Sequence, residues 1–343
     1  MADTQVTREV IEMITGGWRA QALYAAVRFK LPDHVAAGRT ASRELAEETG
    51  ADPEGIRRLM RLMIAMGVFE GDESGGYRST RLSEALITGP GSLSEMCLLY
   101  GEEFYAAWAH SHEAVATAGS GFEIAFGEPL YEYLGDHDGT ARRFQATMNA
   151  ASMFFDRVPE VFDFTGGREI VDVGGGGGEL LASILRATPD ASGVLLEREH
   201  MIPRAKEHLA AAVGLDRVRL VGGDMFAGVP AGGNVYLLSR VLAGWDDDLV
   251  VQVFANCRRG MAGSSSRLLV LDRFVDDDDP TLLPALWDLH LLMTTGGRHR
   301  TLDEISLLLD RAGLVVERVA PLPMDAHALV AAPILPAAPV AGR

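Results

Sequence analysis

The chain has 343 residues, of which 48% are hydrophobic and 23% charged. This length predicts two domains with a sizeable core. The formal net charge of −17 argues against nucleic acids and anionic membranes as partners, because both would repel the chain. Two separated cysteines, Cys97 and Cys257, suit buried thiols better than a disulfide framework, and no metal site is expected. Without a leader or a membrane-length apolar run, we expect a cytoplasmic protein.

The N-terminal region predicts helices. Apolar residues recur at helical spacing over residues 9–37, with a break at Gly16 and Gly17. A second helical stretch begins near Thr40, which is its expected N-cap. A third begins at Pro53 after the N-cap Asp52. This helix is expected to end at Gly67, and its buried stripe is expected to consist of Leu59, Met60, Met63 and Met66.

A short hairpin is expected next. Residues 68–70 and 76–79 read as two strands around the polar residues 72–75, which completes a winged-helix pattern. The basic cluster Arg57, Arg58 and Arg61 is better explained as a solvated helix face than as a DNA-binding surface.

Residues 92–164 read as helices rich in large side chains. Such side chains are more often ordinary core than the wall of a cavity.

The most informative segment is residues 170–180, where a β-branched run enters a glycine cluster and leaves into an apolar helical pattern. This order predicts a strand, a tight turn and a helix start. Glycine lets the backbone reach positive φ and approach a ligand closely, and the free N–H groups of a helix start bind polar or anionic groups. The segment therefore predicts a site for a nucleotide-like cofactor. A dehydrogenase loop is less well matched, because its glycine spacing is met here only through five consecutive glycines.

Further candidate contacts follow later strands. The strand at residues 194–197 ends in Glu197, about 20 residues after the loop, where a carboxylate can accept ribose hydroxyls. Asp224 follows a strand at residues 217–221, and residues 235–240 read as a fourth strand. The carboxyl ends of strands are where open α/β sheets bind ligands.

Four blocks in this order, residues 172–176, 223–226, 242–248 and 296–301, make the chain resemble a known family. It is similar to the class I S-adenosylmethionine-dependent small-molecule O-methyltransferases of plant phenylpropanoid and bacterial polyketide pathways. The resemblance implies an α/β fold with a Rossmann-like C-terminal domain and a mostly α-helical, winged-helix N-terminal domain that forms a homodimer. The domains expected are residues 1–91 for dimerisation, 92–165 for connecting helices, 166–335 for catalysis and 336–343 for a flexible tail.

The resemblance also assigns the cofactor contacts. Asp172 contacts the amino group of S-adenosylmethionine or only orders the loop, and the carbonyl of Ser239 holds the same amino group. The other implied contacts are Gly174 and Gly176 to the methionine part, Glu197 to the ribose, Asp224 and Met225 to the adenine edge, and Phe226 and Trp245 to its faces.

The expected catalytic residues depart from the family pattern. Ala243 occupies the position of the histidine that removes the acceptor's proton, and His299 replaces a glutamate. Asp272 matches an acid that orients the family's base. Either His299 takes over as the general base, or it is a polar loop residue without a chemical role. An acceptor that is already acidic would need no protein base and would rely on proximity and orientation.

The implied substrate wall predicts a flat, mostly apolar acceptor. Its expected residues are Trp108, Met148, Phe154 and His290. The sequence thus predicts O-methylation of a small aromatic or polycyclic natural product in secondary metabolism. The alternative is an enzyme that keeps the cofactor but catalyses hydroxylation, decarboxylation or cyclisation, as some relatives without the histidine do.

Overall fold

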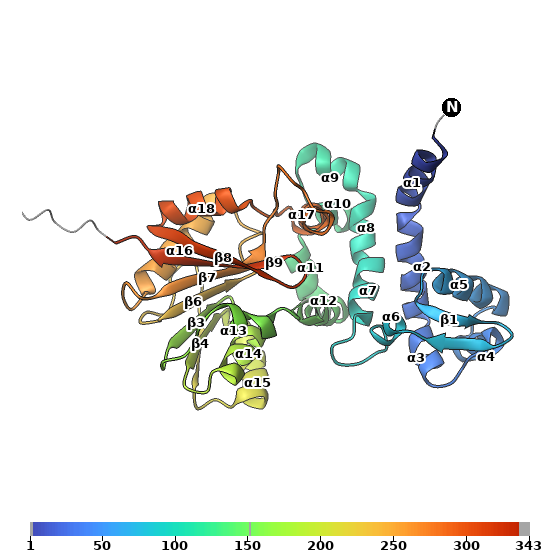
Figure 1. The fold of residues 1–343 in the computed structure, drawn as a ribbon, viewed down its shortest axis with the longest axis horizontal. Helices are drawn as coiled ribbons and strands as arrows, with labels where there is room; N and C mark the ends of the chain where they lie inside the picture. Colours follow the sequence, from blue (N-terminus) through green and yellow to red (C-terminus); the bar gives the residue numbers. More distant parts are fainter. Residues whose placement is uncertain (1–2, 151, 336–343) are drawn as a thin grey trace, which may run out of the picture. The chain divides into compact units, whose positions relative to one another are not determined.

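A computed structural model describes residues 3–150 and 152–335 of the chain (Figure 1). The chain divides into two compact units, one of residues 1–112 and 122–151 and the other of residues 113–121 and 152–343. The predicted flexible tail, residues 336–343, lies outside the described residues. Among the described helices, none combines the length and the apolar character that crossing a membrane requires.

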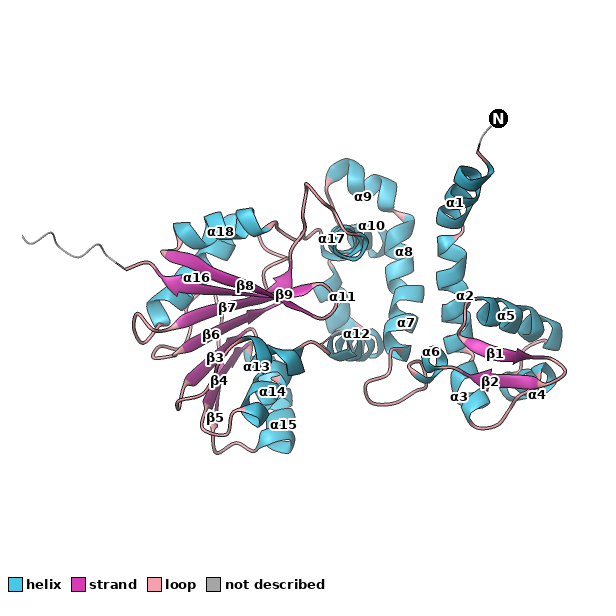
Figure 2. Cartoon of the chain, in the orientation of Figure 1, coloured by secondary structure: helices cyan, strands magenta, loops and turns pink. Residues whose placement is uncertain are grey.

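The first unit is mostly helical and carries one hairpin (Figure 2). The hairpin pairs β1 (Phe69–Asp72) antiparallel with β2 (Gly76–Ser79), as predicted. The helices are α1 (Thr4–Ile14), α2 (Gly16–Arg28), α3 (Leu31–Ala36), α4 (Ser42–Thr49), α5 (Pro53–Ala65), α6 (Arg81–Glu84), α7 (Ser94–Gly101), α8 (Glu103–Ala109), α11 (Leu130–Asp136) and α12 (Asp138–Ala150). Two more, α9 (Ser111–Thr117) and α10 (Gly121–Phe126), cross the boundary between the units.

The start of α5 follows its sequence signals. The Asp52 carboxylate accepts hydrogen bonds from the N–H groups of Glu54 and Gly55 at 2.9 and 3.1 Å, which satisfies two of the otherwise unpaired donors of the helix. Of the predicted stripe, Met60 and Met63 are fully buried, whereas Leu59 and Met66 are only partly buried against the same core.

The start of α4 differs from the prediction. Its N-cap is Ala41, not Thr40, and the carboxylate of Glu44 accepts from the N–H groups of both residues, at 3.1 and 2.9 Å. Only the glutamate half of a capping box is therefore formed, because alanine has no side-chain oxygen to accept the reciprocal hydrogen bond. The first helical break also lies one residue earlier than expected, at Thr15.

The second unit is built on a seven-stranded sheet in the order β5-β4-β3-β6-β7-β9-β8. The strands β3 to β7 are parallel to one another, and β9 is antiparallel to both β7 and β8. Their bounds are β3 (Glu169–Val173), β4 (Ser192–Glu197), β5 (Val218–Gly222), β6 (Val235–Ser239), β7 (Arg267–Arg273), β8 (Leu314–Leu322) and β9 (Ala326–Pro333). This confirms the four predicted strands and the Rossmann-like fold.

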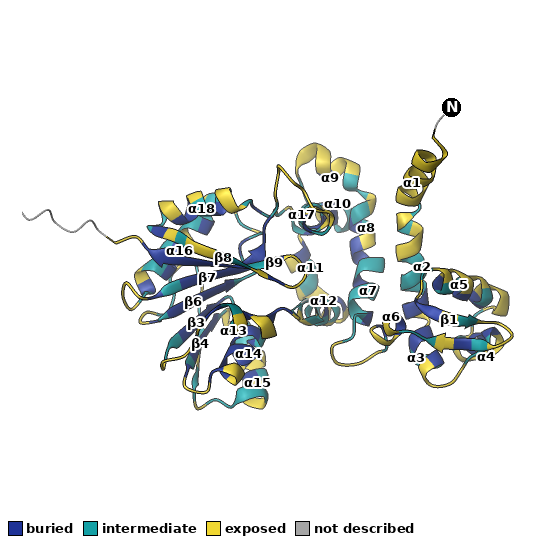
Figure 3. Ribbon diagram, in the orientation of Figure 1, coloured by how far each residue is buried: buried dark blue, intermediate teal, exposed yellow. Residues whose placement is uncertain are grey.

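Helices cover both faces of this sheet, which is why its strands are apolar on both sides (Figures 1 and 3). One core lies under η1 (Phe155–Arg157), α13 (Val158–Val161), α14 (Glu179–Ala187) and α15 (Ile202–Val213), and the other under α16 (Asp247–Gly260) and α18 (Leu302–Arg311). The remaining elements are η2 (Glu199–Met201) and α17 (Leu282–Thr295). Because β3 to β7 are parallel, their carboxyl ends share one edge, where the candidate residues Asp172, Glu197, Ser239 and Asp272 lie.

Candidate functional site

The glycine loop joins β3 to α14 and is shaped by its neighbours. Gly174 and Gly176 have φ values of +69° and +58°, a region that side chains other than glycine rarely adopt. Gly175 has no room for a side chain, because a Cβ there would lie 2.5 Å from Oδ2 of Asp172. The loop backbone therefore packs directly onto that carboxylate.

Asp172 is fully buried at the end of β3. Within the part of the chain that the structure describes, neither carboxylate oxygen has a hydrogen-bond partner. Burial, together with the nearby acids Glu179 and Glu197, raises the pKa of Asp172 to about 7. An unpaired buried carboxylate is costly, and an ammonium group placed beside it would compensate that cost. This is the environment expected for a group that binds the amino group of a cofactor.

A second polar group at this edge is also unpaired. The Oγ atom of Ser239, at the end of β6, is buried and has no hydrogen-bond partner among the described residues. β6 is the direct neighbour of β3 in the sheet. The oxygen atoms at this edge can accept hydrogen bonds and thus fit a ligand with an amino group.

Glu197 is held at the end of β4. Its Oε2 accepts from the N–H of Gly176 at 3.0 Å and its Oε1 from the N–H of Arg198 at 2.7 Å. A carboxylate oxygen accepts more than one hydrogen bond, so the fixed carboxylate can also accept from ribose hydroxyls.

The loop after β5 forms the adenine side of the predicted site. Oδ1 of Asp224 accepts from the N–H of Phe226 at 2.9 Å, and the ring of Phe226 meets Trp245 edge to face with centroids 4.8 Å apart. The amide nitrogen of Asn256 donates to the carbonyls of Met225 and Phe226 at 2.7 and 3.0 Å. Asn256, only 3% exposed on α16, therefore fixes this loop. The sequence analysis missed it, although a polar residue beside buried Val253 and Cys257 was a signal.

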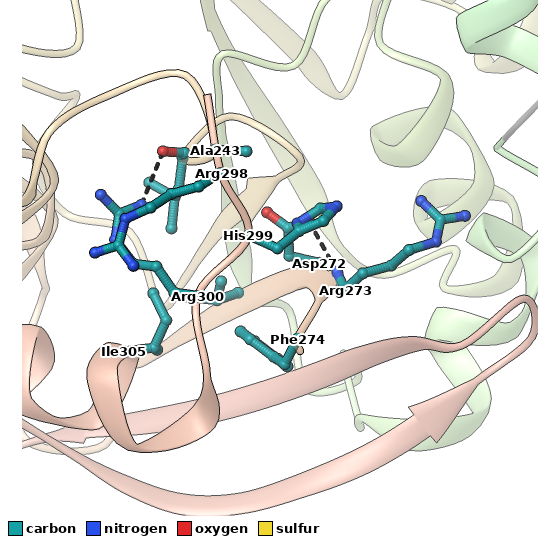
Figure 4. Close-up of a pocket in the computed structure, with 10 residues that line it drawn as sticks. Ala243, Asp272, Arg273, Phe274, Arg298, His299, Arg300 and Ile305 are labelled. Carbon is teal, nitrogen blue, oxygen red and sulfur yellow. Dashed lines mark hydrogen bonds and ion pairs between the residues drawn. The ribbon is translucent and has the colours of Figure 1, made fainter. Parts of the chain in front are cut away.

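Arg300 anchors the loop that carries Ala243. Its guanidinium, 3% exposed, donates to the carbonyls of Leu242 and Trp245 at 3.2 and 2.6 Å and to the carboxylate of Asp247 at 2.9 Å. The N–H of Arg298 donates to the carbonyl of Ala243 at 2.9 Å (Figure 4). The segments around residues 243 and 299 are thus tied together. Sequence reasoning quoted Arg300 within a motif but gave it no role.

Asp272 and His299 come together in a small pocket of the second unit (Figure 4). Nδ1 of His299 lies 3.7 Å from Oδ1 of Asp272, which is longer than a hydrogen bond, and both side chains are less than a tenth exposed. Burial raises the pKa of Asp272 to about 6, although the Arg273 N–H donates to it at 2.8 Å. Burial, and then the charge of Arg273, lowers the pKa of His299 to about 4. At neutral pH the pair is a carboxylate beside a neutral imidazole.

The backbone of the His299 loop is also fixed. The N–H of His299 donates to the carboxylate of Asp288 on α17 at 2.6 Å. The loop begins after Gly296, which ends α17 with a φ of +70°. The backbone at His299 is therefore fixed against α17, and its side chain is less than a tenth exposed.

The predicted substrate residues lie in different surroundings. Trp108 on α8 and Met148 on α12 are half-buried in the first unit. Phe154 is fully buried in a core of the second unit and meets Phe155 edge to face, which favours the core alternative for this residue. His290 is buried on α17 with its ring edge-on to Trp287 at 5.6 Å, and burial lowers its pKa to about 4.

Comparison with known proteins bears on this site. A family model described as an O-methyltransferase domain matches residues 108–315, and one described as an O-methyltransferase dimerisation domain matches residues 11–89. The chain is 43% identical to phenazine-1-carboxylate N-methyltransferase of Pseudomonas aeruginosa, over 95% of this chain and 97% of that protein. It is 38% identical to 3-amino-4-hydroxybenzoate 4-O-methyltransferase of Streptomyces cremeus, over 94% and 89%. The solved structure of the pyocyanin biosynthetic protein PhzM superposes with a TM-score of 0.89 at 42% identity, covering 96% of this chain and 100% of that one.

Proposed function

Because the chain belongs to the O-methyltransferase family of S-adenosylmethionine-dependent enzymes, we propose that it methylates an oxygen of a small aromatic or polycyclic natural product. S-adenosylmethionine supplies an electrophilic methyl group when bound. The observation that carries the proposal is the buried carboxylate of Asp172 beneath the glycine loop, which has no hydrogen-bond partner among the described residues and lies at the same edge of the sheet as Asp272.

The cofactor would be held by residues from several strand ends. Asp172 and the carbonyl of Ser239 hold its amino group, Glu197 its ribose, and the loop at Asp224 its adenine. Gly174 and Gly176 allow close approach of the backbone, and Met225, Phe226 and Trp245 supply apolar contact. Asn256 and Arg300 act through the loops that they position.

Removal of the acceptor's proton is the step for which this site lacks a strong base. An imidazole whose pKa lies at about 4 is some six units below an ordinary phenol, which corresponds to an uphill transfer of about 8 kcal/mol. If His299 acts as the base, the carboxylate of Asp272, 3.7 Å from its Nδ1, is the group placed to stabilise the imidazolium that forms. The site therefore suits an acidic acceptor, such as a phenol conjugated to a carbonyl, and proximity does the rest.

A second candidate is methyl transfer to nitrogen. An aromatic ring nitrogen with a free lone pair needs no proton removed before attack. The absence of a histidine at Ala243 and the weak basicity of His299 would then not slow methyl transfer. The relative that is 43% identical is named as an N-methyltransferase of phenazine-1-carboxylate. Oxygen and nitrogen acceptors are therefore tested together.

The test is mass spectrometry of reactions with methyl-deuterated S-adenosylmethionine. The panel contains phenazine-1-carboxylate, 3-amino-4-hydroxybenzoate and hydroxynaphthoates, followed by a metabolite extract from a host without this gene. Label on an oxygen supports the first candidate, and label on nitrogen supports the second. A metabolite that changes only with cofactor present, yet carries no label, would refute both and favour the non-methylating alternative.

The role of His299 is tested by replacing it with glutamine. If His299 is the base, turnover falls about 10²-fold or more while S-adenosylhomocysteine binds as before. The matched variant Ala243→His places an imidazole where the family has its base, and it should increase turnover with a weakly acidic phenol. Full activity of the His299→Gln variant would mean that the acceptor needs no protein base.

We propose that the first unit forms a homodimer. The matching dimerisation model covers residues 11–89, and α1 and α2 expose Ile11, Met13, Ile14 and Trp18. Exposed apolar side chains in such a row favour a protein partner over solvent. Light scattering of the whole chain should give twice the monomer mass, and replacement of Ile14 by lysine should lower it.

A further inference from the structure

The small pocket that Asp272 and His299 share has room for a single water molecule. The volume open to the centre of a water is about 10 Å³, which is the space that one water needs. Much of the wall is formed by buried apolar side chains, those of Leu242, Val270, Phe274 and Ile305. Purely apolar cavities stay dry, whereas a cavity that also offers polar partners holds a water. What this pocket contains therefore depends on its polar groups.

The arginines of the wall already have partners. All three guanidinium nitrogens of Arg300 donate hydrogen bonds, one of them to Asp247 at 2.9 Å. The guanidinium of Arg298 donates to Glu304 and Asp247 at 2.7 and 3.3 Å. Arg273 donates through Nε to a backbone carbonyl at 3.1 Å and lies over an indole ring. These three side chains serve the surrounding loops and strands.

Asp272 and His299 have hydrogen-bonding capacity left over. Oδ1 of Asp272 accepts from the N–H of Arg273 at 2.8 Å, and the described residues offer its Oδ2 no donor. Neither ring nitrogen of His299 forms a hydrogen bond within the described part of the chain, and Nδ1 is 3.7 Å from Oδ1 of Asp272. Figure 4 shows the two side chains next to each other. Two buried polar groups at this separation suit a bridging water.

The two groups differ in how strongly they bind a proton. Burial raises the pKa of Asp272 to about 6, against the lowering effect of the nearby arginines. Burial lowers the pKa of His299 to about 4. The gap of two pKa units means that a proton prefers the carboxylate by about a hundredfold. The charged and titratable groups around Asp272 are Arg240 after β6, Arg273 on β7, His299 and Arg300 after α17, and His327, its partner in register on β9.

We propose that one ordered water bridges Asp272 and His299 in this pocket and carries the acceptor's proton to the Asp272 carboxylate. Ala243 lines the same pocket, and its methyl side chain cannot take a proton. The inference rests on the proposed function, in which the acceptor lies beside Ala243, and it names the group that receives the proton. His299 is then a positioning residue that holds the water.

The proton path conserves atoms and charge. The acceptor oxygen uses an electron pair to bond the methyl carbon, and the sulfonium sulfur keeps the pair of the bond that breaks. The O–H proton of the acceptor passes to the water, and one proton of the water passes to a carboxylate oxygen of Asp272. The water is thereby regenerated. The new carboxyl group releases its proton to solvent afterwards, because its pKa of about 6 lies below neutral pH.

A crystal structure of the whole protein with S-adenosylhomocysteine tests the water itself. We expect one ordered water within about 3.2 Å of both a carboxylate oxygen of Asp272 and a ring nitrogen of His299. A pocket without an ordered water, or a water that contacts only one of the two side chains, would overturn the inference.

The pH dependence of kcat/KM tests the proton path, with a phenol of ordinary pKa as acceptor. In the wild type, kcat/KM should rise with pH and level off above about pH 6, because Asp272 must be ionised to accept a proton. Asp272→Asn should lower turnover about 10²- to 10⁴-fold and abolish this break. His299→Gln still offers the water a partner, so it should cost about tenfold and keep the break. A break near pH 4, with the larger loss in His299→Gln, would identify His299 as the base.

Three controls separate the proton path from misfolding. Asp272→Asn should bind S-adenosylhomocysteine as the wild type does, since it changes the charge and not the size of the side chain. Asp272→Glu keeps a carboxylate and should recover part of the turnover. His327→Gln replaces the histidine opposite Asp272 on β9 and should leave the break near pH 6 in place. A break that persists in Asp272→Asn, or disappears in His327→Gln, would contradict the assignment.

The outcome is separable from that of the proposed function. Methyl label on oxygen, with equal turnover in Asp272→Asn and the wild type, would uphold the function and refute the proton path. Label on nitrogen alone would refute the oxygen acceptor and with it the proton path, while the crystal structure would still decide whether the water is bound.

Discussion

Replacing Asp172 with asparagine should stabilise the cofactor-free protein while impairing its function. The pKa of the buried carboxyl is about 7, compared with 3.8 for the unburied group. Each pKa unit corresponds to about 1.4 kcal/mol, so complete ionisation costs the folded state about 4 kcal/mol relative to the unfolded chain. Asparagine is nearly isosteric and carries no charge, so it avoids this cost.

The raised pKa of Asp172 also determines how the stability of the cofactor-free protein changes with pH. Between pH 4 and pH 7 the folded chain keeps a proton on Asp172 that the unfolded chain has released, so stability falls as pH rises through this window and is lowest above pH 7. The stability difference between the Asp172→Asn variant and the wild type should therefore grow by about 2 kcal/mol from pH 5.5 to pH 7 and then level off.

The assay is urea unfolding followed by circular dichroism, without cofactor, at several pH values from 5.5 to 8.5. Asp310→Asn, which changes an exposed acid at the end of α18, is the matched control and should show no such trend. A difference that does not vary with pH would refute the raised pKa. A wild type more stable than the variant at pH 8 would refute the claim that the carboxylate is unpaired.

Cofactor binding should show the opposite effect. The Asp172→Asn variant should bind S-adenosylhomocysteine at least tenfold more weakly, because it loses a charge-assisted contact to the amino group. Wild-type binding near pH 7 should release protons, visible as a calorimetric enthalpy that depends on the buffer. If the variant binds as tightly as the wild type, Asp172 only orders the loop.

The remaining predictions concern the scaffold of the site. Gly175→Ala should lower the thermal midpoint by several degrees, because its Cβ would lie 2.5 Å from Oδ2 of Asp172, whereas Gly228→Ala, with nothing within 4 Å, should not. Arg300→Lys should destabilise the protein by about 2–4 kcal/mol in urea unfolding, since an ammonium cannot make all of its hydrogen bonds, and a loss below 0.5 kcal/mol would contradict its anchoring role. Asn256→Ala should weaken S-adenosylhomocysteine binding about tenfold by calorimetry, with no change in the affinity for an aromatic acid as the control. Unaltered cofactor binding would show that the loop at Met225 keeps its conformation without Asn256.

Local patterns fixed much of the fold in advance. The β-branched run before the glycines, the acid at the end of β4 and the turn after β5 are signals that each span only a few residues, so the strand ends and the glycine loop could be predicted directly. The cap at Asp52 was equally local, since it depends on N–H groups two and three residues away. The cap expected at Thr40 was wrong because the helix starts one residue later, with Ala41 at the N-cap and the Glu44 carboxylate accepting from the N–H groups of Thr40 and Ala41.

Contacts between distant segments could not be read in this way. That Asn256 holds the loop at Met225, and that Arg300 holds the loop at Ala243, depends on how helices and loops pack against the sheet. The hydrogen bonds join residues 31 and 58 positions apart, for which the sequence carries no periodic signal.

The sequence alone was enough to give the family, the cofactor and the strand ends, because these depend on short motifs. Tertiary structure decided the electrostatics. Asp172 is buried without a hydrogen-bond partner among the residues that the structure describes, and burial makes His299 a weak base; no motif encodes either property. Only the pairing of β6 with β7 brings Arg240 and Arg273 close to Asp272, whose pKa both arginines lower. Electrostatic interactions of this kind depend on distance, which the order of residues along the chain does not give.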